Sequence, residues 1–307
     1  MPFNPPQNHP PISPHTLDAS YTPLRSLIAT GGGGDSTSII LVRHTSTHLM
    51  CVRKALRGTM SSPRDRHSWR EELELHRSLS HRNIVGYVDA FMDATIGKAA
   101  LFTEYCDLGS LGDLRRHMGG GPSRVPEAFV WHVMRGVVEA VVYCHRGPPG
   151  GGPGGLRWLS VVHRDIKPDN IFLQSRPGAA VGAGYPLVKL GDFGAAIGAE
   201  NPEFYAMEAL RGTRGWQPPE FPNFGQRGDV WSVGAVVQSL CRLGTDGIEP
   251  GAGVGKHYGE DLDECVGACL VEEKADRPYA REVALMVEEL GVGSRYCFKA
   301  LPPWAFG

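Results

Sequence analysis

The eight residues from His163 to Asn170 form the most informative string in this chain of 307 residues, because they read H-R-D-I-K-P-D-N. Five of these positions match the pattern H-R-D-x-K-x-x-N, which arises by chance in a chain of this length with a probability on the order of one in ten thousand. The triplet Asp192-Phe193-Gly194 follows 22 residues after Asn170. Two such strings in this order indicate a chemical site rather than a polar surface turn.

The hydrophobic pattern changes near Cys106. Before this residue, short β-type runs surround one amphipathic segment at 68–79, in which Trp69 and three leucines lie among charges. After it, Pro126-Glu127 opens a strongly apolar helix that runs to about His145. The pattern predicts an α+β protein, mostly β in the first third and mostly α in the rest. The expected strands are 38–42, 49–52, 84–88, 100–103, 171–173 and 187–190, and the expected later helices are 229–240, 261–270 and 281–290.

Glycine and proline are in excess, and the excess is concentrated. Six segments that together cover 60 residues hold 34 of the 64 glycines and prolines. The remainder of the chain has an ordinary content of about 12%. The chain therefore reads as a globular protein with flexible inserts. The six segments are 1–24, 31–34, 119–122, 147–155, 177–186 and 247–255.

Charge and composition exclude several function classes. A net charge of −2 gives no electrostatic footprint for nucleic acid or for an anionic membrane, so we expect neither as a partner. No stretch approaches the ~18 apolar residues of a spanning helix, and the Pro-rich start lacks the apolar region of a secretory signal. Seven cysteines without CxxC spacing favour reduced thiols in the cytoplasm or nucleus. Cys265 and Cys269 are expected to be core residues rather than metal ligands.

The two strings resemble the catalytic loop and the metal-binding loop of the eukaryotic protein kinases. Lys167 at its spacing from Asp165 is typical of the serine/threonine branch. The resemblance covers about residues 21–291 and implies a two-lobed protein-kinase fold, with a small β-rich N-lobe that holds one helix and a larger α-helical C-lobe. Further matches are Gly212-Thr213, Pro218-Pro219-Glu220 (with Pro218 where the family has Ala), Asp229–Gly234 and Arg277-Pro278.

Within this family, the chain is most similar in character to the NIMA-related kinases. The cues are the run Tyr105–Leu111, the segments Asn170–Leu173 and Lys189–Asp192, and the insert between the long helix and His163. The resemblance also implies that Glu220 and Arg277 form a buried ion pair that braces the helical lobe.

The resemblance assigns roles to four residues of the two strings. Asp165 would accept or orient the proton of the attacking hydroxyl, and Lys167 would stabilise the charge of the γ-phosphoryl group. Asn170 and Asp192 would bind Mg²⁺, a hard cation that prefers oxygen ligands.

The same resemblance implies a site for ATP. Lys54, at the end of an apolar run, would hold the α- and β-phosphates, and Glu72 would pair with it, although Glu71 and Glu74 are rivals on the same helix. Thr103–Cys106 resembles the gatekeeper and hinge, where the carbonyl of Glu104 and the amide of Cys106 would bind adenine.

The Gly-rich loop departs from the family pattern. Counted back from Lys54, Gly32 and Gly34 fall on its first two glycines, whereas Thr37 stands where the family has the third. Ile39 falls on the residue that packs over adenine. Glycines let backbone amides approach phosphate, so we expect weaker phosphate closure but not loss of nucleotide binding. The alternative is that Gly31–Gly34 is simply a mobile turn.

Two other departures affect regulation. His76 stands where kinases usually place an apolar residue against the Phe of DFG; it either destabilises the active packing or is a satisfied core histidine. Between Ala195 and Gly212 the only hydroxyl is that of Tyr205. Arg164 usually pairs with a phosphate in that stretch, so we expect a fixed carboxylate to replace it, with Glu208 favoured over Glu200 and Glu203.

The sequence therefore predicts an ATP- and Mg²⁺-dependent serine/threonine protein kinase that acts on protein substrates. The alternative is an ATP-binding scaffold of the same fold with weak or no phosphotransfer. A small-molecule kinase is more remote, because it should lack Gly212-Thr213 and Pro218–Glu220. The expected organisation is a disordered tail at 1–20, an N-lobe at 21–103, the hinge and C-lobe at 104–295, and a C-terminal tail at 296–307.

Overall fold

The computed structural model describes residues 19–27, 37–56, 63–93, 97–119, 124–151, 158–176, 184–199, 212–223, 225–243, 248–249, 251–291 and 299–306. These residues form two compact units. The first holds the described residues up to Ser80 together with Val85–Cys106, and the second holds His81–Ile84 together with those from Asp107 onward. The expected boundary, between residues 103 and 104, lies three residues before the division after Cys106.

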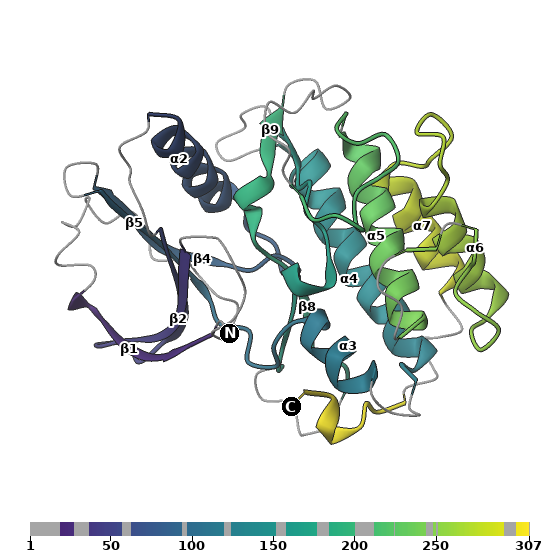
Figure 1. The fold of residues 1–307 in the computed structure, drawn as a ribbon, viewed down its shortest axis with the longest axis horizontal. Coiled ribbons are helices and arrows are strands. Elements are labelled where there is room, and N and C mark those ends of the chain that lie inside the picture. Colours follow the sequence, from purple (N-terminus) through teal and green to yellow (C-terminus); the bar gives the residue numbers. More distant parts are fainter. Residues whose placement is uncertain are drawn as a thin grey trace. The chain divides into compact units, whose positions relative to one another are not determined.

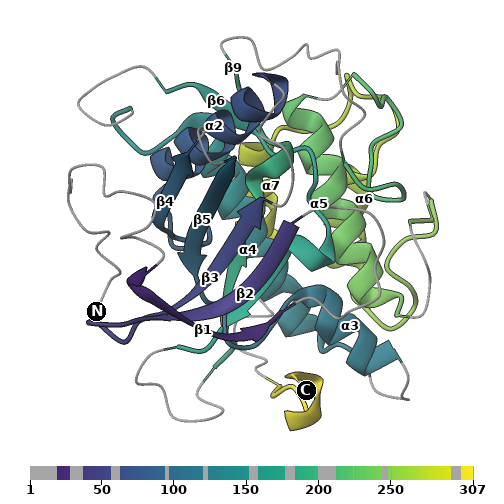
Figure 2. The same cartoon turned by 60° about the vertical axis from the view of Figure 1, so that its left-hand side comes forward.

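The first unit contains an antiparallel sheet in the order β1-β2-β3-β5-β4, and Figure 2 shows these five strands side by side. The register places Ile39 opposite Lys54 and Cys51 opposite Glu104. Residues of the Gly-rich loop pattern and of the hinge thus flank the strand that carries Lys54. The strands are β1 (Tyr21–Ser26), β2 (Thr37–His44), β3 (Met50–Leu56), β4 (Tyr87–Asp93) and β5 (Lys98–Glu104).

One face of this sheet forms an apolar core. Val42, Cys51, Ala100 and Phe102 are fully buried in it, and the ring of Tyr21 stacks on Phe102 with centroids 4.2 Å apart. Side chains along a strand alternate between the two faces, so a slip of one residue would move this apolar set out of the core. Burial therefore fixes the register that positions Lys54.

The described residues of the first unit include one long helix, α2 (Pro63–Ser78), which begins five residues before the expected helix. Trp69 is buried in a cluster with Ala99 and Leu101 of β5, and Leu73 packs against that cluster. Because residues four apart share one helix face, the apolar pair Trp69 and Leu73 anchors that face of α2 to the sheet.

The second unit is mainly helical, as the hydrophobic pattern predicts (Figure 1). None of its described helices is both long enough and apolar enough to cross a membrane, and the same holds for the described part of the first unit. The helix α3, the short strands β6 and β9, and the 3₁₀ turns were not expected from the sequence. The elements are α3 (Leu111–Gly119), α4 (Glu127–Arg146), β6 (Ser160–Val162), η2 (Pro168–Asn170), β7 (Ile171–Gln174), β8 (Leu187–Leu190), η3 (Phe193–Ala195), β9 (Ile197–Ala199), α5 (Gln226–Cys241), α6 (Glu260–Cys269), α7 (Ala280–Leu290) and η5 (Pro303–Phe306).

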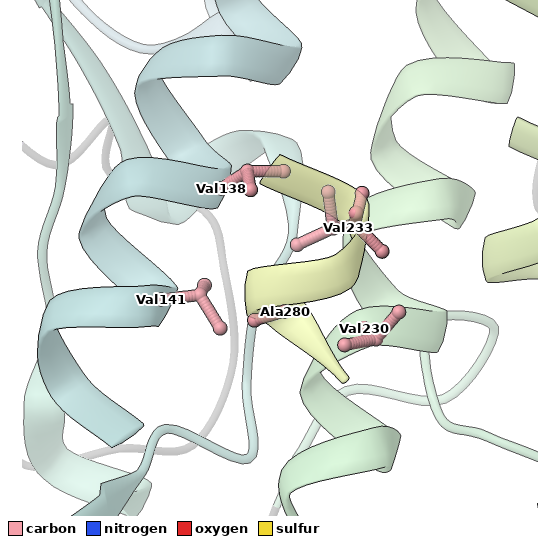
Figure 3. Close-up of a pocket in the computed structure, with 6 residues that line it drawn as sticks. Val138, Val141, Val230, Val233 and Ala280 are labelled. Atoms are coloured by element: carbon pink, nitrogen blue, oxygen red, sulfur yellow. The ribbon is translucent and has the colours of Figure 1, made fainter. Parts of the chain in front are cut away.

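The core of the second unit is built around α4. Figure 3 shows Val138 and Val141 of α4 and Val233 of α5 pointing into a small space beside Ala280, at the start of α7. These side chains are almost fully buried, and each buried valine contributes about 1.5–3 kcal/mol relative to an exposed one. The apolar packing of α4 against α5 and α7 holds the helices on which the loops of the site are mounted.

The short segment His81–Ile84 belongs to the second unit, which corrects the expected strand at 84–88. Asn83 Nδ2 donates to the carbonyl of Val188 at 2.9 Å, and Ile84 forms an isolated bridge with Leu190. The strand β4 therefore begins only at Tyr87. His81 stacks on Tyr143, and burial, with the charges of Arg82 and Lys189, lowers the pKa of His81 to about 4, so its ring is neutral near pH 7.

Two small antiparallel ribbons hold the loops that carry the informative strings. β7 pairs with β8, and β6 pairs with β9. The His163–Asn170 string lies between β6 and β7, and Asp192–Gly194 lies between β8 and β9. Both loops are therefore clamped at each end by strand pairing, although they are separated in the sequence by a Gly- and Pro-rich insert.

Candidate active site

The loop at His163–Lys167 is shaped by a buried carboxylate on α5. Asp229 is fully buried and accepts hydrogen bonds at 2.9 Å from the backbone N–H groups of His163 and Arg164 and from Nε2 of His145. Arg164 has a φ of 67°, a left-handed conformation that costs a non-glycine residue about 1–3 kcal/mol. Asp229 offsets this strain by satisfying two consecutive amides of the loop.

Asp165 lies at the centre of a polar cluster in the second unit. Thr213 Oγ1 donates to Asp165 Oδ1 at 2.8 Å, and Lys167 Nζ lies 3.1 Å from Oδ2. Lys167 Nζ also donates to Thr213 Oγ1 at 2.6 Å. Asn170 Nδ2 donates to both the carbonyl and Oδ2 of Asp165, at 2.8 and 3.0 Å. The structure thus brings together three predicted site residues, Asp165, Lys167 and Asn170, and adds Thr213.

This cluster can remove a proton from a hydroxyl and neutralise developing negative charge. The side chains of Asp165 and Lys167 are 14% and 20% exposed, so each keeps some access to solvent. The carboxylate is an acceptor, and the ammonium group beside it carries the compensating positive charge. A hydroxyl that replaces Thr213 as the donor to Asp165 would stand next to both groups.

Asn170 and Asp192 provide the oxygen atoms for a cation. Both amide hydrogens of Asn170 serve Asp165, so its Oδ1 is the atom left as an acceptor. Asp192 comes two residues after β8, and the amide of its neighbour Gly191 donates to the carbonyl of Asn170 at 2.9 Å. The paired ends of β7 and β8 therefore place a neutral and an anionic oxygen donor on adjacent loops. This donor set fits Mg²⁺, which is usually held by one or two protein carboxylates together with water and phosphate oxygens.

The Asp192–Gly194 loop is attached to the His163–Asn170 loop. His163 Nε2 donates to the carbonyl of Gly191 at 3.1 Å, and the His163 ring lies 4.8 Å from the buried ring of Phe193. Arg164 Nε donates to the carbonyl of Ala195 at 2.6 Å. Asp192 itself has a φ of 59°. The two loops therefore form one hydrogen-bonded framework under Asp165 and Asp192.

In the first unit, Lys54 pairs with Glu72. Lys54 Nζ lies 2.8 Å from Glu72 Oε1, and the two side chains are 20% and 10% exposed. The rivals are placed differently: Glu71 pairs with His67 on the surface, and Glu74 is exposed. The carboxylate of Glu72 fixes the ammonium group of Lys54, which would otherwise sample several rotamers at the sheet surface.

The predicted hinge lies at the end of β5. Glu104 donates its N–H to the carbonyl of Gly86 at 2.8 Å, and its Oε2 accepts the N–H of Gly86 at 3.0 Å. Thr103 pairs with Val52 and with Tyr87 in the sheet, and Cys106 is buried. One main-chain and one side-chain hydrogen bond to Gly86 hold Glu104 in place. The end of β5 therefore fixes the position at which the peptide groups of the hinge begin.

Comparison with known proteins decides the family. The model of the protein kinase domain matches residues 26–283. This chain belongs to the protein kinase family. It is 28% identical over 233 residues to the G2-specific protein kinase nim-1 of Neurospora crassa, a match that covers 68% of this chain and 25% of nim-1. It is 33% identical over 175 residues to the serine/threonine-protein kinase Nek2 of Mus musculus, which covers 56% of this chain and 36% of Nek2.

A third relative extends the match over most of this chain. The serine/threonine-protein kinase Nek9 of Mus musculus is 29% identical over 280 residues, or 85% of this chain and 25% of Nek9. The matched chain thus spans between a quarter and just over a third of the length of these three relatives. The similarity to nim-1, Nek2 and Nek9 agrees with the NIMA-related character expected from the sequence.

Several kinase positions lie outside the described residues. Gly32 and Gly34, together with the segment that holds Glu200, Glu203, Tyr205 and Glu208, are among them, and so is the side chain of Thr37. The structure does describe His76, whose Nε2 donates to the carbonyl of Val85 at 2.8 Å. This bond pairs one ring nitrogen of the buried His76 with the backbone, which favours the interpretation of His76 as a core histidine.

The kinase fold of the second unit is braced by Arg277. Arg277 is fully buried and donates to both carboxylate oxygens of Glu220, at 2.7 and 3.1 Å. It also donates to the carbonyls of Arg227, Val271 and Glu272. The expected ion pair between Glu220 and Arg277 is therefore present, and the remaining donors of the guanidinium group bond to backbone.

Replacing Arg277 with alanine is expected to lower the free energy of unfolding by about 3–5 kcal/mol, because Glu220 would keep a partly buried charge without its partner. Urea denaturation measures this difference. Arg214→Ala removes an exposed arginine and serves as the control. A loss below about 1 kcal/mol, the value of an exposed pair, would show that Arg277 does not brace the unit.

Proposed function

We propose that this chain is a serine/threonine protein kinase, which transfers the γ-phosphoryl group of ATP to hydroxyl groups of protein substrates with the help of Mg²⁺. The observation that carries the proposal is the hydrogen-bonded cluster of Asp165, Lys167, Thr213 and Asn170. Each member supplies a function that phosphoryl transfer needs, and phosphoryl transfer depends mostly on positioning and charge stabilisation.

In the proposed mechanism, Asp165 accepts the hydroxyl proton while the acceptor oxygen forms its bond to the γ-phosphorus and the bond to ADP breaks. Lys167 neutralises charge on the transferred group, since its ammonium lies beside the Asp165 carboxylate. Bound Mg²⁺ would supply electrostatic stabilisation of the phosphate oxygens. Asn170 and Asp192 would hold it through their side-chain oxygens.

The first unit would bind the nucleotide. Lys54, held by Glu72, is proposed to neutralise the α- and β-phosphates. The carbonyl of Glu104 and the amide of Cys106 are proposed to bind adenine, and Ile39 to pack over it. Gly32 and Gly34 remain proposed phosphate contacts by their place in the sequence. We also propose an intracellular protein, cytoplasmic or nuclear, a location supported by the six free thiols of the described residues.

The alternative of an ATP-binding scaffold is separated from the kinase by one pair of measurements. The purified chain is incubated with γ-labelled ATP, Mg²⁺ and a generic protein acceptor, and its thermal midpoint is recorded with and without ATP. The kinase predicts labelled acceptor together with stabilisation by ATP. Stabilisation by ATP without label in the acceptor would support the scaffold and contradict the proposal.

Thr213 offers a sharper test of the cluster. Thr213→Val removes the hydroxyl that forms hydrogen bonds with both Asp165 and Lys167. Because hydrogen bonds to charged groups are stronger than neutral ones, we expect a loss of about 10- to 100-fold in kcat. Thr213→Ser keeps the hydroxyl and should stay close to the wild type. Steady-state phosphotransfer measures both variants. Equal activity of the valine and serine variants would remove Thr213 from the mechanism.

A further inference from the structure

The second unit contains a surface cavity of about 310 Å³ that has no part in the proposed reaction. It lies where the end of α4, the start of α5 and the start of α7 come together, and Figure 3 shows the first turn of α7 lying between α4 and α5. Its volume is at the lower end of the ~300–1,000 Å³ typical of small-ligand sites. The lining residues are Val142, His145, Arg146, Gln226, Tyr279, Ala280 and Arg281.

The lining is positively charged. Two of the seven residues, Arg146 and Arg281, are exposed arginines, and none of the seven is acidic. Two carboxylates close to the lining residues in the structure accept hydrogen bonds: Glu282 Oε2 accepts the N–H of Tyr279 at 2.7 Å, and the buried Asp229 accepts hydrogen bonds from His145 and from the loop amides. An anion that enters this cavity would therefore meet two guanidinium groups and no carboxylate in its lining.

The position of Arg281 is not explained by its own helix. Arg146 lies in the last turn of α4, where the helix dipole favours a cation, but Arg281 is the second residue of α7, where the dipole favours an anion. Gln226 is likewise the first residue of α5. The positive ends of the α5 and α7 helix dipoles lie at the same point as the arginines, so the electrostatic arrangement there suits a negatively charged ligand.

The walls of the cavity are held in place by other contacts. Gln226 Nε2 donates to Ser160 Oγ at 2.7 Å, and the guanidinium group of Arg227 lies 4.3 Å from the centre of the Tyr279 ring. His145 is fixed by Asp229. A pre-formed wall lowers the entropy cost of binding, while the two exposed arginines remain able to adjust to a ligand.

We propose that this cavity is a binding site for a phosphomonoester dianion, with Arg146 and Arg281 as its charged ligands. The planar guanidinium fork matches the oxygens of a phosphate group, and two such groups match a charge near −2. The cavity shares no lining residue with the cluster of Asp165, Lys167, Asn170 and Thr213. Occupancy of this site does not require phosphotransfer, so its test and that of the proposed function fail independently.

The test is a calorimetric titration of the full chain, without nucleotide or Mg²⁺, with N-acetyl-O-phosphothreonine amide. Saturable binding is expected for the wild type. The double variant Arg146→Ala/Arg281→Ala should raise Kd by about tenfold or more, because charge-assisted hydrogen bonds are lost. The double variant Arg146→Lys/Arg281→Lys keeps both charges and should bind with intermediate affinity. This variant keeps the test decisive if the alanine variant fails to fold.

Three controls locate the site. Arg124→Ala removes an exposed arginine outside the cavity and should leave Kd unchanged. Lys54→Met should also leave Kd unchanged. A weaker affinity in this variant would show that the probe binds at the proposed ATP site. The unphosphorylated threonine amide should not bind. Absence of saturable binding to the wild type, an unchanged Kd in the alanine double variant, or an equal loss in Arg124→Ala or Lys54→Met would each overturn the proposal.

Two further arms of the titration identify the source of the phosphate group. A phosphothreonine peptide that binds more tightly than inorganic phosphate at equal ionic strength indicates a phosphorylated protein segment as the ligand. Equal affinities indicate that the site recognises the phosphate group alone, so that a small free phosphate compound is the ligand. Both results support a site for a phosphate group. If neither probe binds, the proposal is contradicted.

Discussion

Replacing Asp165 with asparagine is expected to lower kcat by about 10²- to 10⁴-fold, the range that a positioned general base contributes. Asparagine keeps the shape of the side chain and can still bond to Thr213, but it cannot accept the proton of the attacking hydroxyl. Binding of ATP, followed by thermal stabilisation, should be retained because the proposed nucleotide contacts of Lys54 and the hinge are untouched.

Asp169→Asn is the matched control for this variant. Asp169 lies four residues after Asp165 in the same string, but its exposed carboxylate pairs with Arg116 on α3. It should therefore keep nearly wild-type kcat. If Asp165→Asn and Asp169→Asn lost activity to the same extent, the effect would reflect the charge or the folding of the loop rather than proton acceptance by Asp165.

Replacing Lys54 with methionine is expected to lower kcat/KM by about 10²- to 10³-fold, which is typical of the loss of one pre-organised electrostatic group. Methionine keeps the length of the apolar stem, so β3 should stay in register. The remaining carboxylate of Glu72 would then lack its partner and would repel the phosphates. Steady-state kinetics with varied ATP concentration measure the loss.

The adjacent pair Glu71 and Glu72 gives this prediction its control. Glu72→Gln should weaken the hold on Lys54 and lower activity, whereas Glu71→Gln changes only a surface contact with His67. An equal response of the two glutamine variants would show that general helix charge, and not the 2.8 Å pair with Lys54, supports activity.

Sequence analysis can find the parts of the site whose residues lie close together in the sequence. The loop at His163–Asn170 folds locally, because an intervening turn of 3₁₀ helix brings Asn170 back onto Asp165 within five residues. The spacing that resembles the kinase pattern also favoured Glu72 over its rivals Glu71 and Glu74. The conformation of such a short segment depends mainly on its own residues, so it can be predicted from them.

The sequence did not show the contacts that Thr213 and Asp229 make with distant segments, although the resemblance did imply the distant pair of Glu220 and Arg277. Thr213 reaches Asp165 across 48 positions, and Asp229 reaches His145 and His163 across 84 and 66. No periodicity records such pairings. The sequence offered two signals for these contacts, the Gly212-Thr213 pair and the match at Asp229–Gly234. In the structure Gly212 has a φ of 102°, and a Cβ atom there would meet the carbonyl oxygen of Arg164 at 2.9 Å.

Differences in the fold have similar causes. The apolar run at 84–88 was expected as one strand, but Ile84 forms a bridge with Leu190 of β8 within the second unit, whereas β4 of the first unit begins at Tyr87. The strands β6 and β9 are three residues long, too short for an alternating pattern to appear. In each case a tertiary contact, not local propensity, decides where the element begins and ends.

The central claim is that the Asp165 cluster performs phosphoryl transfer to serine or threonine. The most direct test is a single-turnover reaction with excess enzyme, γ-labelled ATP and Mg²⁺ against peptides that differ only in carrying serine, threonine or tyrosine as the acceptor. The account predicts labelled phosphoserine and phosphothreonine, and loss of the label transfer when Mg²⁺ is chelated. Bound ATP that is not transferred to any acceptor, or transfer to tyrosine alone, would contradict it.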